Sequence, residues 1–183
     1  MMLETIILQP TPVQPTIAAE RFTLRPLRKS DAGLMALYMA DERVARGTRS
    51  VPHPLPPGMV PALIDRAVAP LRAEDIWALD GTGQGLGEVL GLITLARLDR
   101  KQSEISYWVA PAFWNTGLAS EAVRAIIAAN PHGAAQIFAE VFQDNPGSAR
   151  VLTNCGFDYL GDAEAFSVAR NATVPTWTYT LKT

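Results

Sequence analysis

Apolar residues recur three and four positions apart in several stretches of the chain, the spacing of an amphipathic helix. Four stretches show it: residues 32–40, 59–71, 117–130 and 146–155. Residues that favour helix ends mark them, such as Ser30-Asp31 before the first and Asn145-Pro146 before the last. The pattern predicts about four helices.

Other stretches alternate apolar and polar residues or form short apolar runs, as strands do. They cover residues 22–27, 76–79, 86–96, 105–109, 137–142, 159–169 and 176–181. The element order is one strand, two helices, three strands, a helix, a strand, a helix and two strands. The sequence therefore predicts an α/β (α+β) fold, with a mixed, mostly antiparallel central sheet of about seven strands flanked by helices on both faces.

The N-terminal part differs from the rest of this 183-residue chain. Residues 1–20 contain three prolines and few partners for a helix or a sheet, which predicts an extended arm with a short apolar anchor at Ile6–Leu8. Residues 21–183 show neither a linker nor a repeat, so we expect a single domain there.

Composition and charge exclude several classes of protein. Sixteen Lys and Arg face 18 Asp and Glu, for a net charge of −2, which disfavours nucleic-acid binding. The apolar run Val89–Ala96 is far shorter than the ~20 residues of a membrane span. Arg21 is the first basic residue, which does not fit a secretory signal. One cysteine and two histidines are too few for a zinc site, so we expect a cytoplasmic protein without a metal.

Around Gly117 a predicted strand leads through a short loop directly into a helix. Small residues at Gly117 and Ala119 leave backbone N–H groups uncovered, and the positive end of the helix dipole lies behind them. Such an arrangement suits an anion, in particular a diphosphate. A tight turn that requires glycine is the alternative interpretation.

Three motifs carry a resemblance to a known family. The stretch Trp114-Asn-Thr-Gly117-Leu-Ala119 resembles the acetyl-CoA loop of the GNAT N-acetyltransferase superfamily, and Asn145-Pro-Gly-Ser148 followed by Gly156-Phe157 resembles its second cofactor motif. The stretch Arg21-Phe-Thr-Leu-Arg-Pro-Leu with Ser30-Asp31 is similar to the RimJ/RimL branch, whose named members acetylate the N-termini of ribosomal proteins. The likeness spans about residues 20 to 183 and implies a GNAT-like fold.

The resemblance implies acetyl-CoA as the co-substrate, bound where the strand that ends at Val109 diverges from the strand 137–142. Its diphosphate would lie on the amides of residues 115–119, and its pantetheine would pair with the backbone of 107–110. The loop lacks the basic side chain that the family often has there, so amides and dipole must supply more of the binding. The expected cofactor-binding residues are Trp108, Val109, Asn115, Thr116, Gly117, Leu118, Ala119, Ser120, Asn145 and Ser148.

The implied reaction is direct attack of a primary amine on acetyl-CoA in a ternary complex. Glu140, where RimI of this family carries its base, and Glu104 are the candidate general bases; a solvated strand carboxylate is the alternative for both. Leu152 stands where many GNAT enzymes have a tyrosine acid, which leaves Ser148 as the candidate acid, with helix capping as its alternative role.

Two further residues are candidates for binding the acceptor amine. His53 lies in a proline-rich loop of the region that lines the acceptor side in this family, and Tyr107 is near the end of its strand. The acceptor itself, a protein N-terminus or a small amine, stays open, as does a monomer or a homodimer. A GNAT-shaped module that binds CoA without turnover is the alternative function.

Overall fold

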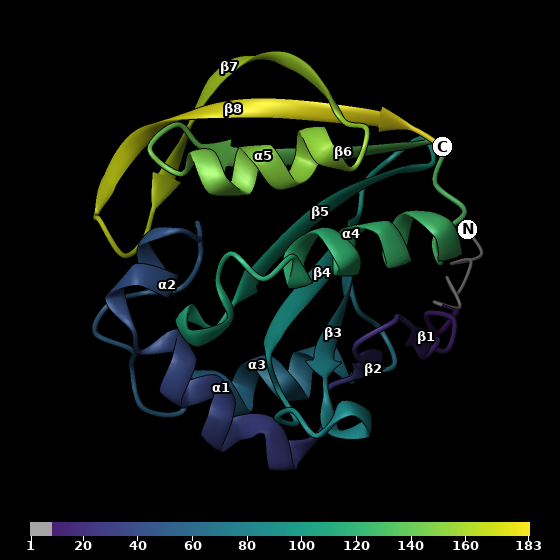
Figure 1. Ribbon diagram of the computed structural model, residues 1–183, viewed down its shortest axis with the longest axis vertical. Coiled ribbons are helices and arrows are strands. Elements are labelled where there is room, and N and C mark those ends of the chain that lie inside the picture. The colour runs from purple at the N-terminus through teal and green to yellow at the C-terminus, as the bar shows by residue number, and fades with distance from the viewer. Residues whose placement is uncertain (1–8) are drawn as a thin grey trace, which may run out of the picture.

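The structure is a computed structural model that describes residues 9–183, so the predicted anchor at Ile6–Leu8 lies outside the described residues. Its centre is an eight-stranded sheet of order β1-β2-β3-β4-β5-β6-β8-β7 (Figure 1). All neighbouring strands are antiparallel except β5 and β6, which are parallel. The strands are β1 (Ile17–Ala18), β2 (Thr23–Pro26), β3 (Glu74–Asp80), β4 (Gly91–Arg97), β5 (Gln102–Val109), β6 (Gln136–Phe142), β7 (Asp158–Ser167) and β8 (Ala172–Lys182).

Helices cover both faces of the sheet. They are α1 (Ala32–Met39), α2 (Glu42–Arg46), α3 (Met59–Ala67), α4 (Leu118–Ala129) and α5 (Pro146–Asn154). In Figure 1, α4 and α5 lie across the front of the sheet, where apolar residues of both pack into one buried cluster with β3 to β6. Residues of α1 and α3 build a second buried cluster with β3 and β4. Among residues 9–183, no helix is long and apolar enough to cross a membrane.

The predicted fold class is confirmed, with differences at short elements. β1 and α2 were not predicted, because two and five residues are too few to show a period. The prediction of a strand from residue 86 is wrong: Leu86 N–H donates to the Gly81 carbonyl (2.9 Å) in a turn, and β4 begins only at Gly91. The helix predicted for 59–71 ends at Ala67, three residues before Pro70.

The described part of the predicted arm, residues 9–20, lies against β2 and β3. Ile17–Ala18 pair with β2, the Trp77 indole N–H donates to the Pro15 carbonyl (2.8 Å), and Gln14 Nε2 donates to the Ile76 carbonyl (2.9 Å). These contacts fasten the segment along the outer strands of the sheet.

A buried ion cluster explains the motif around Arg25. The Arg25 guanidinium donates to both carboxylate oxygens of Asp31 (2.8 and 2.9 Å) and to Asp80 (2.6 Å), with the Arg25 side chain only 5% exposed. The two carboxylates raise the pKa of Arg25 against the effect of its burial. The cluster therefore fixes β2 to the start of α1 and to the end of β3.

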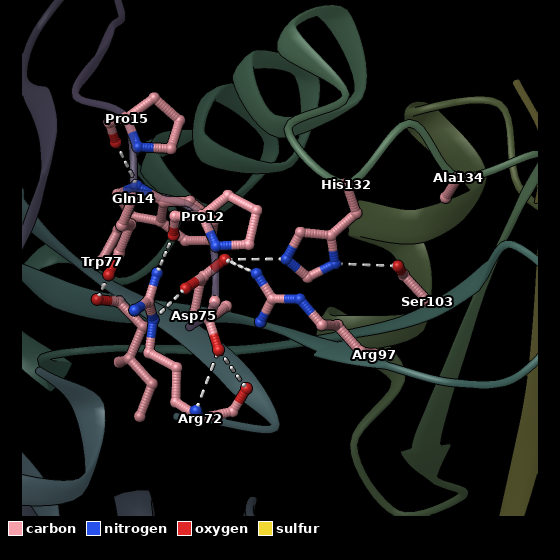
Figure 2. Close-up of polar contacts among 12 residues, drawn as sticks. Pro12, Gln14, Pro15, Arg72, Asp75, Trp77, Arg97, Ser103, His132 and Ala134 are labelled. Carbon is pink, nitrogen blue, oxygen red and sulfur yellow. Dashed lines mark hydrogen bonds and ion pairs between the residues drawn. The ribbon is translucent and has the colours of Figure 1, made fainter. Parts of the chain in front are cut away.

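A second polar cluster surrounds Asp75 at the other end of β3. Figure 2 shows Arg72, Arg97 and His132 directed at the Asp75 carboxylate, at 2.6, 2.6 and 2.8 Å. His132 Nδ1 lies 3.0 Å from the Ser103 hydroxyl, and Asp75 is 2% exposed. The cluster joins β3, β4 and β5 to the loop that follows α4.

Candidate active site

The parallel strands β5 and β6 form a split in the sheet. They pair only at Gln102–Glu104 with Gln136–Phe138, and no pairing continues toward Val109 and Phe142. Directly after β5, Ala110 N–H donates to the carbonyl of Leu90, the residue that precedes β4 (2.9 Å). Since hydrogen bonds alternate along a strand, the backbone N–H of Val109 faces away from β4, toward the split.

A cavity of about 670 Å³ opens at this split. Its walls come from the end of β5, the loop to α4, the first turn of α4, the start of α5, and α2 with the turn between β7 and β8. The volume is that of a typical ligand site.

The loop before α4 has the backbone of an anion site. Asn115 and Gly117 adopt left-handed conformations, with φ of 60° and 82°. Within the described chain, no protein acceptor takes the N–H groups of residues 115–120, although those of the later turns are paired. Several free amides at the positive end of a twelve-residue helix provide the donors that a diphosphate requires.

Two side chains hold this loop in place. Arg21 donates to the Thr116 carbonyl (2.8 Å) and to Glu121 in the first turn of α4 (2.6 Å). The Trp114 indole N–H donates to the Val109 carbonyl (2.7 Å). Trp114 thus fastens the loop to the end of β5.

How much of the binding the backbone amides and the dipole supply stays a prediction, but the cavity also has basic side chains from other elements. They are Arg43 and Arg46 of α2, Arg150 of α5 and Arg170 of the turn between β7 and β8. Arg43 lies over the Trp114 ring, 5.7 Å from its centroid, and Asp144 is the one acidic residue that the described part of the chain contributes to the lining. No local motif could show this, since the four arginines come from three separate segments.

The hydroxyls of Tyr107 and Ser148 meet beside the split. Tyr107 OH donates to the Ser148 carbonyl (2.9 Å), and Ser148 Oγ donates to Tyr107 OH (3.2 Å). Burial raises the pKa of Tyr107, so its hydroxyl stays protonated at neutral pH. Asn145 caps α5 by accepting from Ser148 N–H (3.3 Å), and Leu152 is buried in the core.

A second cavity, of about 470 Å³, lies on the face of the sheet that carries α1 and α3. It shares Gly47, Tyr107, Trp108 and Ser148 with the first, so the two cavities meet beside the split. Glu104 and Glu140 line it, with side chains 27% and 17% exposed. Arg49 lies between them: it pairs with Glu104, and its Nη1 is 3.2 Å from Glu140 Oε1.

The structure brings most of the predicted site residues together. The first cavity is lined by Trp108, Val109, Asn115, Gly117, Leu118, Ala119, Ser120, Asn145 and Ser148. Thr116 lies in the same loop but does not line the cavity, and the exposed His53 lines neither cavity. Arg49 was missed, because an arginine in a loop of the printed sequence gives no sign of two carboxylates 55 and 91 positions away.

Comparison with known proteins places the chain in a family. Residues 21–158 match the acetyltransferase (GNAT) domain, which is more than half of the chain. Over 78 residues the chain is 35% identical to an uncharacterized N-acetyltransferase, YoaA, of Bacillus subtilis. That match covers 40% of this chain and 44% of the relative, so it spans less than half of either protein.

Solved structures share the fold. An acetyltransferase (GNAT family) from Bacillus anthracis matches with a TM-score of 0.76 at 19% identity, over 92% of this chain and 98% of that one. RimJ of Mycobacterium smegmatis, in complex with CoA-disulfide, matches with a TM-score of 0.74 at 19% identity, over 92% and 87%. The fold and the free amides before α4 are consistent with the matched domain. Because that domain covers more than half of the chain, the chain belongs to the GNAT acetyltransferase family.

Proposed function

We propose that this protein transfers the acetyl group of acetyl-CoA to a primary amine by direct attack in a ternary complex. The observation that supports this most is the meeting of two cavities at Tyr107, Trp108 and Ser148 beside the split. Two reactants that enter from opposite faces of the sheet would meet there without an acyl-enzyme step.

The first cavity fits the co-substrate. Free amides of residues 115 and 117–120 and four arginines line a volume of about 670 Å³, which suits the diphosphate and 3′-phosphate of CoA. When bound, acetyl-CoA supplies an activated thioester. The Val109 N–H, which faces the split, is the donor that would polarise its carbonyl.

Glu140 is the better placed of the two candidate bases. The register pairs Glu104 with Phe138, so Glu140 lies two residues further along the split, toward Val109. It lines the second cavity at 17% exposure and is directed at the same guanidinium as Glu104. In this proposal Glu140 accepts the proton of the amine, directly or through water, and Glu104 holds the acceptor.

Replacing Glu140 by glutamine is therefore expected to lower kcat/KM at pH 7 by about 10²–10⁴-fold, the usual contribution of a general base. Glu104→Gln serves as the matched variant and should lower it by about tenfold, mainly through KM. Release of the CoA thiol, followed from pH 6 to pH 10, checks both. Because a higher pH deprotonates the amine without a base, the deficit of Glu140→Gln should shrink as pH rises. Equal losses in both variants would contradict the assignment of the base.

Tyr107 is the proposed donor to the departing thiolate, with Ser148 holding its hydroxyl. Tyr107→Phe removes only that hydroxyl and is expected to lower kcat by about 10- to 100-fold. The affinity for acetyl-CoA, measured by calorimetry, should stay within about twofold of the parent. An unchanged kcat would show that the thiolate, with an ordinary thiol pKa of about 8.5, needs no donor from the protein.

A module that binds CoA without turnover is the second candidate function. The observation that favours it is the pairing of Arg49 with both carboxylates of the second cavity. Thiol release from acetyl-CoA in the presence of a panel of primary amines separates the two functions. Turnover above the hydrolysis background supports the enzyme, whereas saturable binding without turnover supports the module.

A further inference from the structure

Arg49 is a fixed part of the wall of the second cavity. It lies in the loop between α2 and α3, and its carbonyl accepts from Val168 N–H (3.0 Å). Arg170 donates to the carbonyl of Arg46, the last residue of α2 (2.7 Å). Both contacts come from the turn between β7 and β8, so this turn anchors the end of α2 and the loop that follows it. The Arg49 guanidinium is held in addition by its ion pairs with Glu104 and Glu140.

The charges around this cavity do not balance. Among residues 9–183, its charged lining residues are Arg49, Arg66, Glu74, Glu104 and Glu140. Three carboxylates thus face two guanidiniums, and one negative charge is left over. Because charges interact more strongly in a partly enclosed site than in water, the cavity favours a ligand with a single positive charge.

The rest of the wall combines apolar side chains with the hydroxyls of several serines and threonines. The apolar side chains that line the cavity from α1, α3, the loop between α2 and α3, and the strands are Met39, Val51, Met59, Leu63, Ile76 and Leu92. They lie on the face of the sheet that packs against α1 and α3. An apolar group attached to the amine would find hydrophobic contacts there.

We propose that the acceptor is a primary amine with one positive charge and an apolar body, and that Arg49 sets this preference by cancelling one carboxylate charge. The proposal rests on the proposed function. A polyamine brings positive charges that the cavity cannot match, and a free amino acid brings a carboxylate toward Glu104 and Glu140. A small arylalkylamine and the first residue of an apolar peptide share the required chemistry.

The test compares kcat/KM for four acceptors with the full chain and acetyl-CoA. They are 2-phenylethylamine, an amidated peptide that begins with leucine and has no charged side chain, spermidine, and phenylalanine. We expect each of the first two to exceed each of the last two by about tenfold or more. The ratio of amine to peptide distinguishes the two sources. A parent enzyme that prefers spermidine or phenylalanine overturns the inference but leaves the proposed function standing, whereas no transfer to any acceptor overturns both.

Arg49→Met tests the role of the guanidinium, because it removes the charge and keeps an unbranched side chain. The ratio of kcat/KM for spermidine to that for 2-phenylethylamine should rise by about tenfold. Arg49→Lys keeps the charge and should keep the parent ratio, as should Lys29→Met, which removes one positive charge from an exposed site outside the cavity. An unchanged ratio in a folded Arg49→Met variant overturns the role of Arg49. If that variant fails to fold, the order of the four acceptors by kcat/KM, measured with the parent and with Arg49→Lys, tests the inference instead.

Discussion

Replacing Asp75 by asparagine is expected to lower the free energy of unfolding by about 3–5 kcal/mol, the cost of leaving buried partners of an ion cluster without their counter-charge. The Asp75 carboxylate accepts from Arg72, Arg97 and His132, and its own side chain is 2% exposed. An amide of the same size cannot accept three such donors. Arg72 and His132, at 8% and 5% exposure, would stay buried with lost partners.

Chemical denaturation at pH 7 measures this loss. Asp65→Asn is the matched control, because Asp65 is exposed on α3 and forms no ion pair within residues 9–183. Its effect should stay within about 0.5 kcal/mol. A loss below about 1 kcal/mol in Asp75→Asn would show that the cluster is not a main source of stability.

Because of the same cluster, the free energy of unfolding is expected to fall at acidic pH. Burial alone would raise the pKa of Asp75, but hydrogen bonds from His132 and Arg72, with the charge of Arg97, lower it from 3.8 to about 2. The folded pKa lies below the unfolded one, so the contribution is complete above pH 3.8 and disappears as pH falls through about 2. The contribution is about 2 kcal/mol. In Asp75→Asn this part of the pH dependence should be absent.

Replacing Ala119 by glutamate is expected to weaken acetyl-CoA binding by about 100-fold or more. Ala119 lies in the first turn of α4 and lines the first cavity, beside the free amides of residues 115–120. A carboxylate there would compete with the diphosphate for the amides and repel it. Since an acidic residue in the first turn stabilises a helix, the variant should unfold no more easily than the parent.

Ala119→Gln is the matched control, with the same size and no charge. Calorimetric titration with acetyl-CoA should show a loss of about tenfold or less for glutamine, from size alone, and the much larger loss only for glutamate. Equal affinity in the two variants would mean that no phosphate lies at the start of α4. Thermal unfolding of both variants shows whether the fold is intact.

Much of the fold could be predicted because its signals are local. The strand, loop and helix around Gly117, and the cap at Asn145, each lie within a few residues of sequence. Arg25 and Asp31, which both belong to the motif singled out in the sequence, form a buried ion pair in the structure. Short elements such as α2, and the start of β4 after a turn, depend on tertiary contacts and could not be predicted from periodicity.

The chemistry of the site was harder to predict, because it depends on residues distant in sequence. Arg170 reaches the first cavity from the turn between β7 and β8, and Arg49 reaches Glu140 across 91 positions. The loop at Asn115 and Gly117 could be predicted from its own residues, since backbone amides need no distant partner. Tyr107 was predicted to contact the acceptor and Ser148 to act as the acid, but no local pattern showed that their hydroxyls lie 3.2 Å apart across 41 positions of sequence.

Acetyl transfer to 2-phenylethylamine, followed by mass spectrometry of the amine, tests the central claim most directly. We predict that the parent protein forms the N-acetylated amine in step with release of the CoA thiol, and that Ala119→Glu, equally folded, does so far more slowly at the same acetyl-CoA concentration. A folded parent protein that binds acetyl-CoA but acetylates none of the four acceptors would contradict the claim that the two cavities form one transferase site.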